Sequence, residues 1–160
     1  GVARVVLTGS TRRYTKFPDA IARAIARAEA LAIERKLPWT FINPTMVVGE
    51  DGKKNVQRIA TFIRRFGVVP LPDAGRMLVR PIYTADLAAC LEAALTHPQS
   101  LGRSIVAAGR DSVDYATLIR GVATAIHAPV RIVSVPAALL MAAGWLGRKS
   151  GRGEIGRAHV

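Results

Sequence analysis

Cysteine is nearly absent from this sequence of 160 residues, which holds a single one, Cys90. One cysteine cannot close an internal disulfide, so the sequence excludes the small secreted domains that disulfides stabilise. We therefore expect a reducing compartment, the cytoplasm. The three histidines lack the spacing of a metal site, so no metal centre is predicted.

Long apolar runs are also missing. The longest, residues 133–147, is shorter than the roughly 20 residues that cross a bilayer, and Pro136 interrupts it, so no membrane span is predicted. Aromatic residues make up only 6% of a chain that is half hydrophobic, so the core must be built from Ala, Val, Ile and Leu.

Acidic residues are scarce, with 11 Asp and Glu against 23 Lys and Arg, and the net charge is +12. Such a charge raises the question of nucleic-acid binding. The basic residues are scattered in pairs, and no stripe of basic and aromatic side chains of the kind that stacks bases is present. We therefore predict no nucleic-acid partner and expect a basic groove for a phosphorylated small molecule.

Strand and helix patterns alternate along the chain, which indicates an α/β fold. Strands are expected at 3–8, 38–43, 78–83, 104–108 and 130–135, and helices at 19–36, 56–66, 84–95, 114–127 and after Pro136. Asp19 and Thr84 are expected to cap their helices, and Asp114 to start the helix to His127. The apolar spacing of helix 84–95 predicts that Cys90 is a small buried hydrophobic residue.

The two ends of the sequence look cut. Residues 154–160, EIGRAHV, resemble a translated sequencing adapter, as in a metagenomic fragment. We therefore expect residues 148–160 to be a disordered, artefactual tail, and residues 1–147 to hold a partial cofactor-binding domain with a substrate lobe. The chain starts directly in a buried parallel strand, so upstream strands are expected.

Four short motifs follow one another in the sequence. A strand ends in Gly9-Ser10-Thr11, a long helix carries Glu29, a second strand leads into Asn43-Pro44-Thr45-Met46-Val47-Val48-Gly49, and RPIYTADLAA follows at 80–89. In this order and without gaps, they resemble the C-terminal half of an extended or atypical short-chain dehydrogenase/reductase (SDR), the superfamily of NAD(P)-dependent nucleotide-sugar epimerases and dehydratases.

The resemblance implies the C-terminal part of a Rossmann-like, doubly wound parallel sheet plus a small α/β substrate-binding lobe. It also implies NAD or NADP as cofactor and a nucleotide sugar as a ligand. The family's Gly-rich phosphate loop and its ribose-selecting residue belong upstream, and neither is in this chain. The choice between NAD and NADP is therefore open.

The resemblance also assigns site residues. Gly9 and Ser10 match the active-site turn, where Ser10 would hydrogen-bond the reacting oxygen; a strand-end turn residue is the alternative. Pro44, Thr45 and Met46 match the segment that approaches the nicotinamide, although the family usually has Arg-Pro here. Arg76 and Arg80 are candidates for a substrate diphosphate or are solvated surface charges. Asp86 matches a helix-capping acid.

The catalytic pair of the superfamily is Tyr-x-x-x-Lys, in which the Tyr transfers a proton and the Lys lowers its pKa. Aligned through Glu29 and Pro44, these positions fall on Ile21 and Ile25, which cannot transfer protons. Tyr14 offers a phenol from the preceding loop, but no Lys follows it at four residues. The apolar row Ile21, Ile25, Ala28 and Ala32 predicts a core wall or, through helix 19–36, a homodimer interface.

Two functions remain open at this stage. The first is a cofactor-binding sensor or assembly module without the standard Tyr/Lys catalysis, like the atypical branches of the superfamily. The second is an active NAD(P)-dependent epimerase, dehydratase or reductase acting on a nucleotide sugar.

Overall fold

The computed structural model describes residues 4–16, 18–49 and 53–139. They fall into two compact units, one within Gly1–Gln57 and Val79–Ser112, the other within Arg58–Leu78 and Val113–Val160. The expected tail at 148–160 and most of the helix expected after Pro136 lie outside the described residues.

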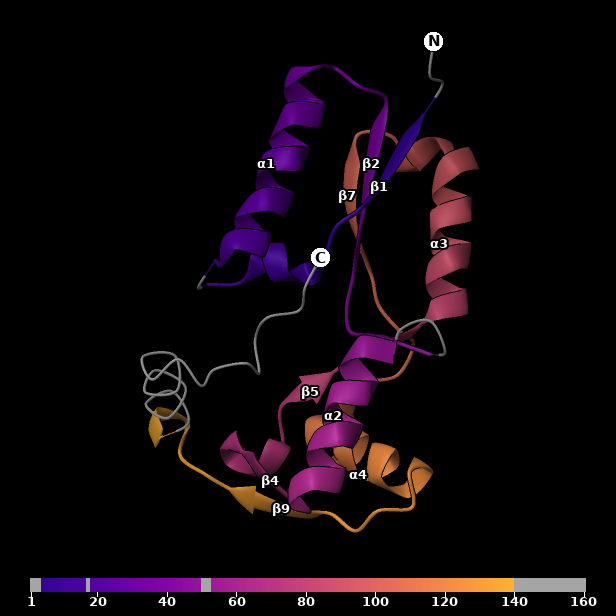
Figure 1. Ribbon diagram of the computed structural model, residues 1–160. Coiled ribbons are helices and arrows are strands. Elements are labelled where there is room, and N and C mark those ends of the chain that lie inside the picture. Colours follow the sequence, from indigo (N-terminus) through magenta and orange to yellow (C-terminus); the bar gives the residue numbers. More distant parts are fainter. Residues whose placement is uncertain (1–3, 17, 50–52, 140–160) are drawn as a thin grey trace. The chain divides into compact units, whose positions relative to one another are not determined.

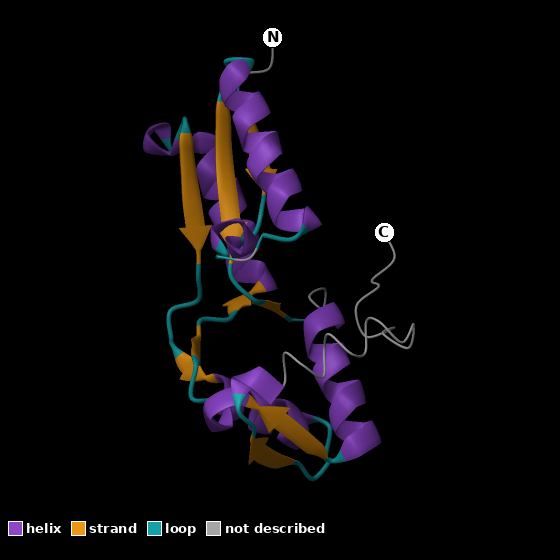
Figure 2. Cartoon of the chain, turned by 90° about the vertical axis from the view of Figure 1, so that its left-hand side faces the viewer, coloured by secondary structure: helices purple, strands orange, loops and turns teal. Residues whose placement is uncertain are grey.

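Three parallel strands form the sheet of the first unit, in the order β1-β2-β7. They are β1 (Val5–Thr8), β2 (Trp39–Pro44) and β7 (Arg103–Ala107). Helices α1 (Ala20–Glu34) and α3 (Thr84–Thr96) lie on opposite sides of this sheet (Figure 1; Figure 2). The prediction of an α/β fold with a doubly wound parallel sheet is confirmed.

The central strand β2 is buried along nearly its whole length because helices cover both faces of the sheet. On the α3 side, Ile42 packs with apolar residues of β7 and α3 in one cluster. That cluster consists of Ile42, Ile82, Ala94 and Ala107, with Val6, Val47, Leu87, Leu91 and Ile105 against it. Small and branched aliphatic residues therefore build this core, as the low aromatic content predicts.

The start of α1 is set by Asp19, whose carboxylate accepts a hydrogen bond from the amide of Ala22 at 2.8 Å. The cap prediction is thus confirmed. The expected core row of this helix is partly wrong, since Ile21 and Ala28 are exposed while Ala22, Glu29 and Ala32 are buried. The buried Glu29 carboxylate is paired with Arg13, as a charge on the side facing the sheet requires.

Helix α3 rests on the sheet through a narrow row of residues. Leu87, Leu91 and Ala94 pack on the core, whereas Cys90 and Leu95 are exposed. The prediction that Cys90 is buried is therefore wrong. One side of the helix packs against the three-stranded sheet and the β3–β6 pair, and only residues spaced three or four apart reach them, so the neighbouring positions face outward.

Short elements occupy segments where the sequence predicted loops. The expected loop 9–18 contains the 3₁₀ turn η1 (Thr11–Tyr14), and the expected loop 44–55 contains β3 (Val47–Val48), which pairs with β6 (Ile82–Tyr83). Two short elements remain. The 3₁₀ turn η3 (Pro98–Ser100) belongs to the first unit, and strand β5 (Leu78–Val79) has one residue in each unit. The strand expected at 78–83 is broken between β5 and β6, where Pro81 lacks an amide hydrogen for a ladder.

The second unit is a small α/β lobe. Its parallel pair consists of β4 (Val68–Leu71) and β9 (Arg131–Ser134), and its other elements are α2 (Lys53–Phe66), which begins in the first unit, η2 (Pro72–Gly75), β8 (Val113–Asp114) and α4 (Tyr115–Ala125). Strand β4 and turn η2 lie between residues 66 and 78, where the sequence predicted neither a strand nor a helix. Asp114, where this helix was predicted to start, caps α4 through a 2.6 Å hydrogen bond from the amide of Thr117.

In the described ranges, the structure contains no helix long and apolar enough to cross a membrane.

Candidate functional site

The turn after β1 carries the first candidate residues. Gly9 donates its amide hydrogen to the carbonyl of Ile42 at 2.8 Å, which extends the strand pairing by one residue. Ser10 is extended and precedes η1, and its hydroxyl oxygen accepts a hydrogen bond from the amide of Arg12 at 3.2 Å. Ser10 is thus a turn cap whose hydroxyl hydrogen is still available to a ligand.

A fully buried amide side chain lies beneath this turn. Asn43, near the end of β2, accepts a hydrogen bond at Oδ1 from the amide of Ser10 at 3.1 Å. Because a backbone amide can only donate, this bond fixes which end of the Asn43 side chain is oxygen. The nitrogen Nδ2 therefore points to Ser104 of β7, whose hydroxyl oxygen lies at 2.8 Å.

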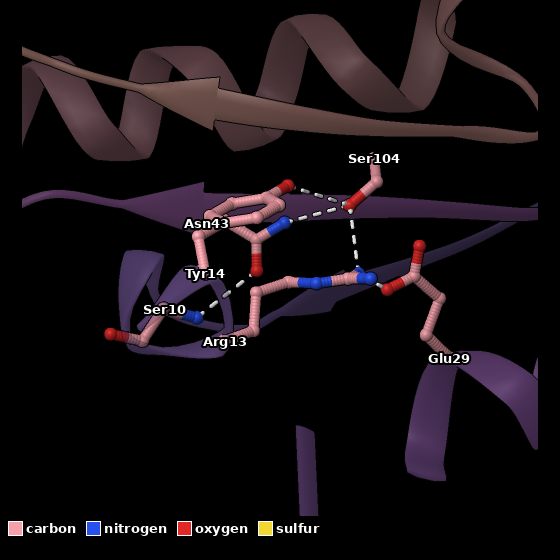
Figure 3. Close-up of polar contacts among 6 residues, drawn as sticks. All are labelled: Ser10, Arg13, Tyr14, Glu29, Asn43 and Ser104. Carbon is pink, nitrogen blue, oxygen red and sulfur yellow. Dashed lines mark hydrogen bonds and ion pairs between the residues drawn. The ribbon is translucent and has the colours of Figure 1, made fainter. Parts of the chain in front are cut away.

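Arg13 of η1 reaches across the same face of the sheet. Its guanidinium forms an ion pair with the buried carboxylate of Glu29 from α1, and Nη1 donates to the Ser104 hydroxyl at 3.3 Å. Figure 3 shows Arg13 extended between these two partners. The pair is largely removed from water, so the two charges must neutralise each other locally.

Tyr14 lies at the outer edge of this group of side chains. Its hydroxyl is 3.5 Å from Oγ of Ser104, and the Arg13 guanidinium carbon is 5.0 Å from the centre of its ring (Figure 3). Its side chain is half exposed, unlike the residues beneath it. We name these six residues the polar cluster: Ser10, Arg13, Tyr14, Glu29, Asn43 and Ser104.

Sequence reasoning identified Ser10 and Tyr14 as site residues but did not assign the other four members of the cluster a role. Glu29 served only as an alignment mark, and Asn43 only as a departure from the family's Arg. A polar residue at the end of a buried strand is a signal for Asn43. Ser104 gave no such signal, since its partners are 61 to 91 residues away in sequence.

The two isoleucines at the expected Tyr and Lys positions differ in their exposure to solvent. Ile21 is 53% exposed, and Ile25 is partly buried against the turn after β1. A methyl-bearing carbon of Ile25 is 3.2 Å from the place where a Cβ on Gly9 would stand, and Asn43 Oδ1 is only 2.2 Å from it. The space beside Gly9 is therefore filled by an apolar and an amide group, with no ammonium.

The segment after β2 is fixed through its backbone. The Pro44 carbonyl accepts from the Thr11 hydroxyl at 3.2 Å, the Thr45 amide donates to Ala107, and the Met46 carbonyl accepts from Ile82, the last two at 2.9 Å. Pro44, Thr45 and Met46 therefore form a rigid continuation of the strand, next to the turn that holds Ser10.

The two candidate arginines belong to different units. Arg80, in the first, donates from Nε to the Ser112 hydroxyl at 2.7 Å, and its carbonyl accepts from the Thr45 hydroxyl. Arg76, in the second, forms an exposed ion pair with Asp73, whose hydrogen bond raises the pKa of Arg76 and lowers that of Asp73. Arg80 is thus tied to the Pro44–Met46 segment, and Arg76 is already paired.

Further predictions concern Asp86, Thr84 and metal binding. Asp86 lies in the first turn of α3, where a carboxylate stabilises the helix dipole. The prediction that Thr84 caps this helix is wrong, because Tyr83 holds the cap position and Thr84 is the first helical residue. Over the residues that the structure describes, no group of His, Cys, Asp and Glu side chains is placed to hold a metal ion.

No protein-family model matches the sequence. Among solved structures, an SDR superfamily protein from Agrobacterium tumefaciens with bound NAD matches at a TM-score of 0.65, 17% identity, 86% of this chain and 57% of its own. The dTDP-glucose 4,6-dehydratase from Bacillus anthracis in complex with NAD matches at 0.60, with 15% identity, 82% and 50% coverage. The fold is that of the short-chain dehydrogenase/reductases.

A third solved structure and one curated protein extend this result. UDP-glucose 4-epimerase from Thermotoga maritima with UDP-glucose has a TM-score of 0.64 and 14% identity over 85% of this chain and 51% of its own. NADH dehydrogenase [ubiquinone] 1 alpha subcomplex subunit 9, mitochondrial, from Arabidopsis thaliana is 25% identical over 112 residues. The match covers 69% of this chain and 28% of that protein, so this chain spans only part of its relatives' length.

The site fits one end of a dinucleotide. The carboxyl ends of the adjacent parallel strands β1 and β2 bring Ser10 and Pro44–Met46 to the same edge of the sheet, which is where ligands bind in open α/β sheets. These 160 residues contain no Gly-rich loop for the phosphates.

Proposed function

We propose that this chain is the C-terminal part of an NAD(P)-binding SDR protein that acts without the standard Tyr/Lys catalysis, as a cofactor-binding sensor or assembly module. The observation that carries this proposal is the pair Ile21 and Ile25. One is exposed and the other packs beside Gly9, and neither can move a proton. The curated relative, which is named as a subunit of NADH dehydrogenase, also supports a module in an assembly.

In this proposal, Gly9, Ser10 and the segment Pro44–Met46 hold the nicotinamide end of NAD or NADP. When bound, the dinucleotide would supply hydride-transfer chemistry. The chain's own residues contribute a hydroxyl at Ser10 and a rigid backbone after β2, and Ile25 keeps water out of the space beside Gly9. Residues outside this chain would hold the phosphates and select between the two cofactors.

We also propose the partners that fit this site. Arg80 lies next to the Pro44–Met46 segment and suits a substrate diphosphate, while Arg76, in the other unit, is a separate candidate for a phosphate contact. The outward face of α1 carries the exposed apolar residues Ile21, Ala24, Ala28 and Leu31, which supports a homodimer through helix 19–36. We expect a cytoplasmic protein without a nucleic-acid partner.

The test compares binding with turnover in the full-length protein that carries this chain. We expect NADH or NADPH to bind with a micromolar or lower Kd, as followed by nicotinamide fluorescence, and no hydride transfer with UDP-glucose, dTDP-glucose or UDP-N-acetylglucosamine. Steady turnover of any of these would overturn the loss of catalysis. Absence of dinucleotide binding would overturn the cofactor.

The second candidate function is an active NAD(P)-dependent nucleotide-sugar epimerase, dehydratase or reductase. The observation that favours it is Tyr14, a half-exposed phenol beside a guanidinium and close to Ser10 in sequence. Turnover that disappears in Tyr14→Phe but not in Tyr83→Phe would support this candidate, since Tyr83 is an equally exposed tyrosine of the same unit.

A further inference from the structure

The Ser104 hydroxyl oxygen is the shared acceptor of the polar cluster. Ser104 Oγ receives hydrogens from Asn43 Nδ2 at 2.8 Å and from Arg13 Nη1 at 3.3 Å. Both partners can only donate, because the amide oxygen of Asn43 is already identified by the Ser10 amide and a guanidinium has no acceptor. A hydroxyl oxygen has two lone pairs, so these two donors occupy its acceptor capacity.

The Ser104 hydroxyl hydrogen must then be given away. Its near neighbour is the Tyr14 hydroxyl at 3.5 Å, a long contact in which either oxygen is able to donate. With Ser104 fully used as an acceptor, Ser104 is the donor and the Tyr14 oxygen accepts. The phenolic hydrogen of Tyr14 is therefore directed away from the cluster.

The Tyr14 side chain and a neighbouring position of β7 are both about half exposed. Its side chain is 52% exposed, and Val106, the next residue of β7 on the same face as Ser104, is 48% exposed. Helix α1 therefore leaves Val106, at the β7 edge of this face, partly uncovered within the described part of the first unit, and the Tyr14 side chain is accessible from solvent.

The charges of the turn are balanced. Arg12 is paired with Asp19 at 3.0 Å, and Arg13 is paired with Glu29. Neither guanidinium of η1 is left to neutralise a phosphate, so the outward hydroxyl suits an uncharged acceptor such as a carbonyl or sugar hydroxyl oxygen.

We propose that Tyr14, held by Ser104, Asn43 and the Arg13–Glu29 pair, is a hydrogen-bond donor to an uncharged oxygen of a bound ligand, the sugar oxygen of a nucleotide sugar. The site holds the ligand whether or not the protein turns it over. The inference rests on the proposal that a nucleotide sugar binds, and it adds the residue that grips the sugar. Ser104, Asn43 and Arg13 act as positioning residues.

The test uses saturation-transfer NMR on the chain with UDP-glucose, in which the hexose and uracil protons report separately. We expect both sets to receive saturation in the wild type. Tyr14→Phe removes one uncharged hydrogen bond and should lose the hexose saturation, keep the uracil saturation and weaken UDP-glucose binding about three- to tenfold. Ser104→Ala should act in the same direction, and Tyr83→Phe should change nothing.

The outcomes separate this inference from the proposed function. Three outcomes would overturn the role of Tyr14 while leaving nucleotide binding in place. They are uracil saturation without hexose saturation in the wild type, hexose saturation that is unchanged in Tyr14→Phe, and an equal loss of hexose saturation in Tyr83→Phe. Hexose saturation that depends on Tyr14 without uracil saturation would uphold Tyr14 and remove the nucleotide part of the ligand. Saturation of neither would overturn both.

Discussion

Asn43 and Ser104 lie on the same face of the sheet, and Nδ2 of Asn43 donates to Oγ of Ser104 at 2.8 Å while Oδ1 accepts from the turn of Ser10. One buried amide thus connects two neighbouring strands and the turn that follows a third. Asn43 is completely inaccessible to solvent, so water cannot replace it in these bonds.

Replacing Asn43 by Leu should therefore destabilise the chain. The change leaves the Ser10 amide and the Ser104 hydroxyl without this partner, and each such group costs about 1–3 kcal/mol when buried. Urea denaturation followed by circular dichroism measures the loss. Thr124→Val, on the exposed side of α4, is the matched control and should change stability little. A similar effect in both variants would contradict a special role for the amide.

Gly9→Ala should destabilise the chain by about 1–3 kcal/mol, because the new Cβ would stand 2.2 Å from Asn43 Oδ1 and 3.2 Å from Ile25. Gly121, inside α4, has open space within 4 Å of the place where a Cβ would stand, so Gly121→Ala should raise stability by up to about 1 kcal/mol through helix propensity. Thermal unfolding of both variants measures the two changes in stability. Equal changes in Tm would show that a Cβ at position 9 fits without a clash.

Arg4 caps the C-terminal end of α3. Its Nη1 donates to the carbonyls of Ala94 at 3.0 Å and His97 at 2.7 Å and to the Ser100 hydroxyl at 3.2 Å. Arg4→Met should lower stability by about 1–2 kcal/mol, since charged hydrogen bonds and the helix dipole are lost together. The exposed Arg103→Met is the control for charge alone. Hydrogen exchange at the end of α3 should accelerate only in Arg4→Met.

The cap of α4 should make stability sensitive to acid. The hydrogen bond from the Thr117 amide holds the pKa of Asp114 below its ordinary value of 3.8. A lowered pKa means that the stabilisation is complete above about pH 3.8 and is lost as the pH falls through the folded-state pKa. Asp114→Asn keeps an acceptor and should lessen the fall in Tm between pH 5 and pH 2, whereas Asp114→Ala should lower Tm throughout.

Ile21→Tyr combined with Ile25→Lys should give the full-length protein measurable hydride transfer with a nucleotide sugar. The spacing of four residues puts both side chains on one face of α1, and Ile25 already lies beside Gly9. Arg23→Tyr with Arg27→Lys has the same spacing on another exposed face of α1 and should stay inactive. Retained dinucleotide binding without any gain of turnover would show that the site no longer admits a substrate.

The sequence by itself determined the order of the elements and the helix starts. Alternating apolar patterns predicted the strands of the sheet, and Asp19 and Asp114 marked the starts of their helices, because a cap joins a side chain to an amide only three residues away. The α/β fold and its likeness to the SDR fold follow from such local signals taken in order. The short elements of the loops carried weaker signals, since two-residue strands have no periodicity of their own.

Only the tertiary structure decided which faces of the helices are buried and which polar residues meet. The period of α1 allows more than one face toward the sheet, and the folded chain buries the one with Ala22, Glu29 and Ala32, which leaves Ile21 exposed. Cys90 is exposed because it lies on the side of α3 opposite the core cluster that holds Leu87, Leu91 and Ala94. Ser104 reaches Tyr14 only because β7 pairs with β2 in one register, a pairing between distant segments that no local pattern fixes.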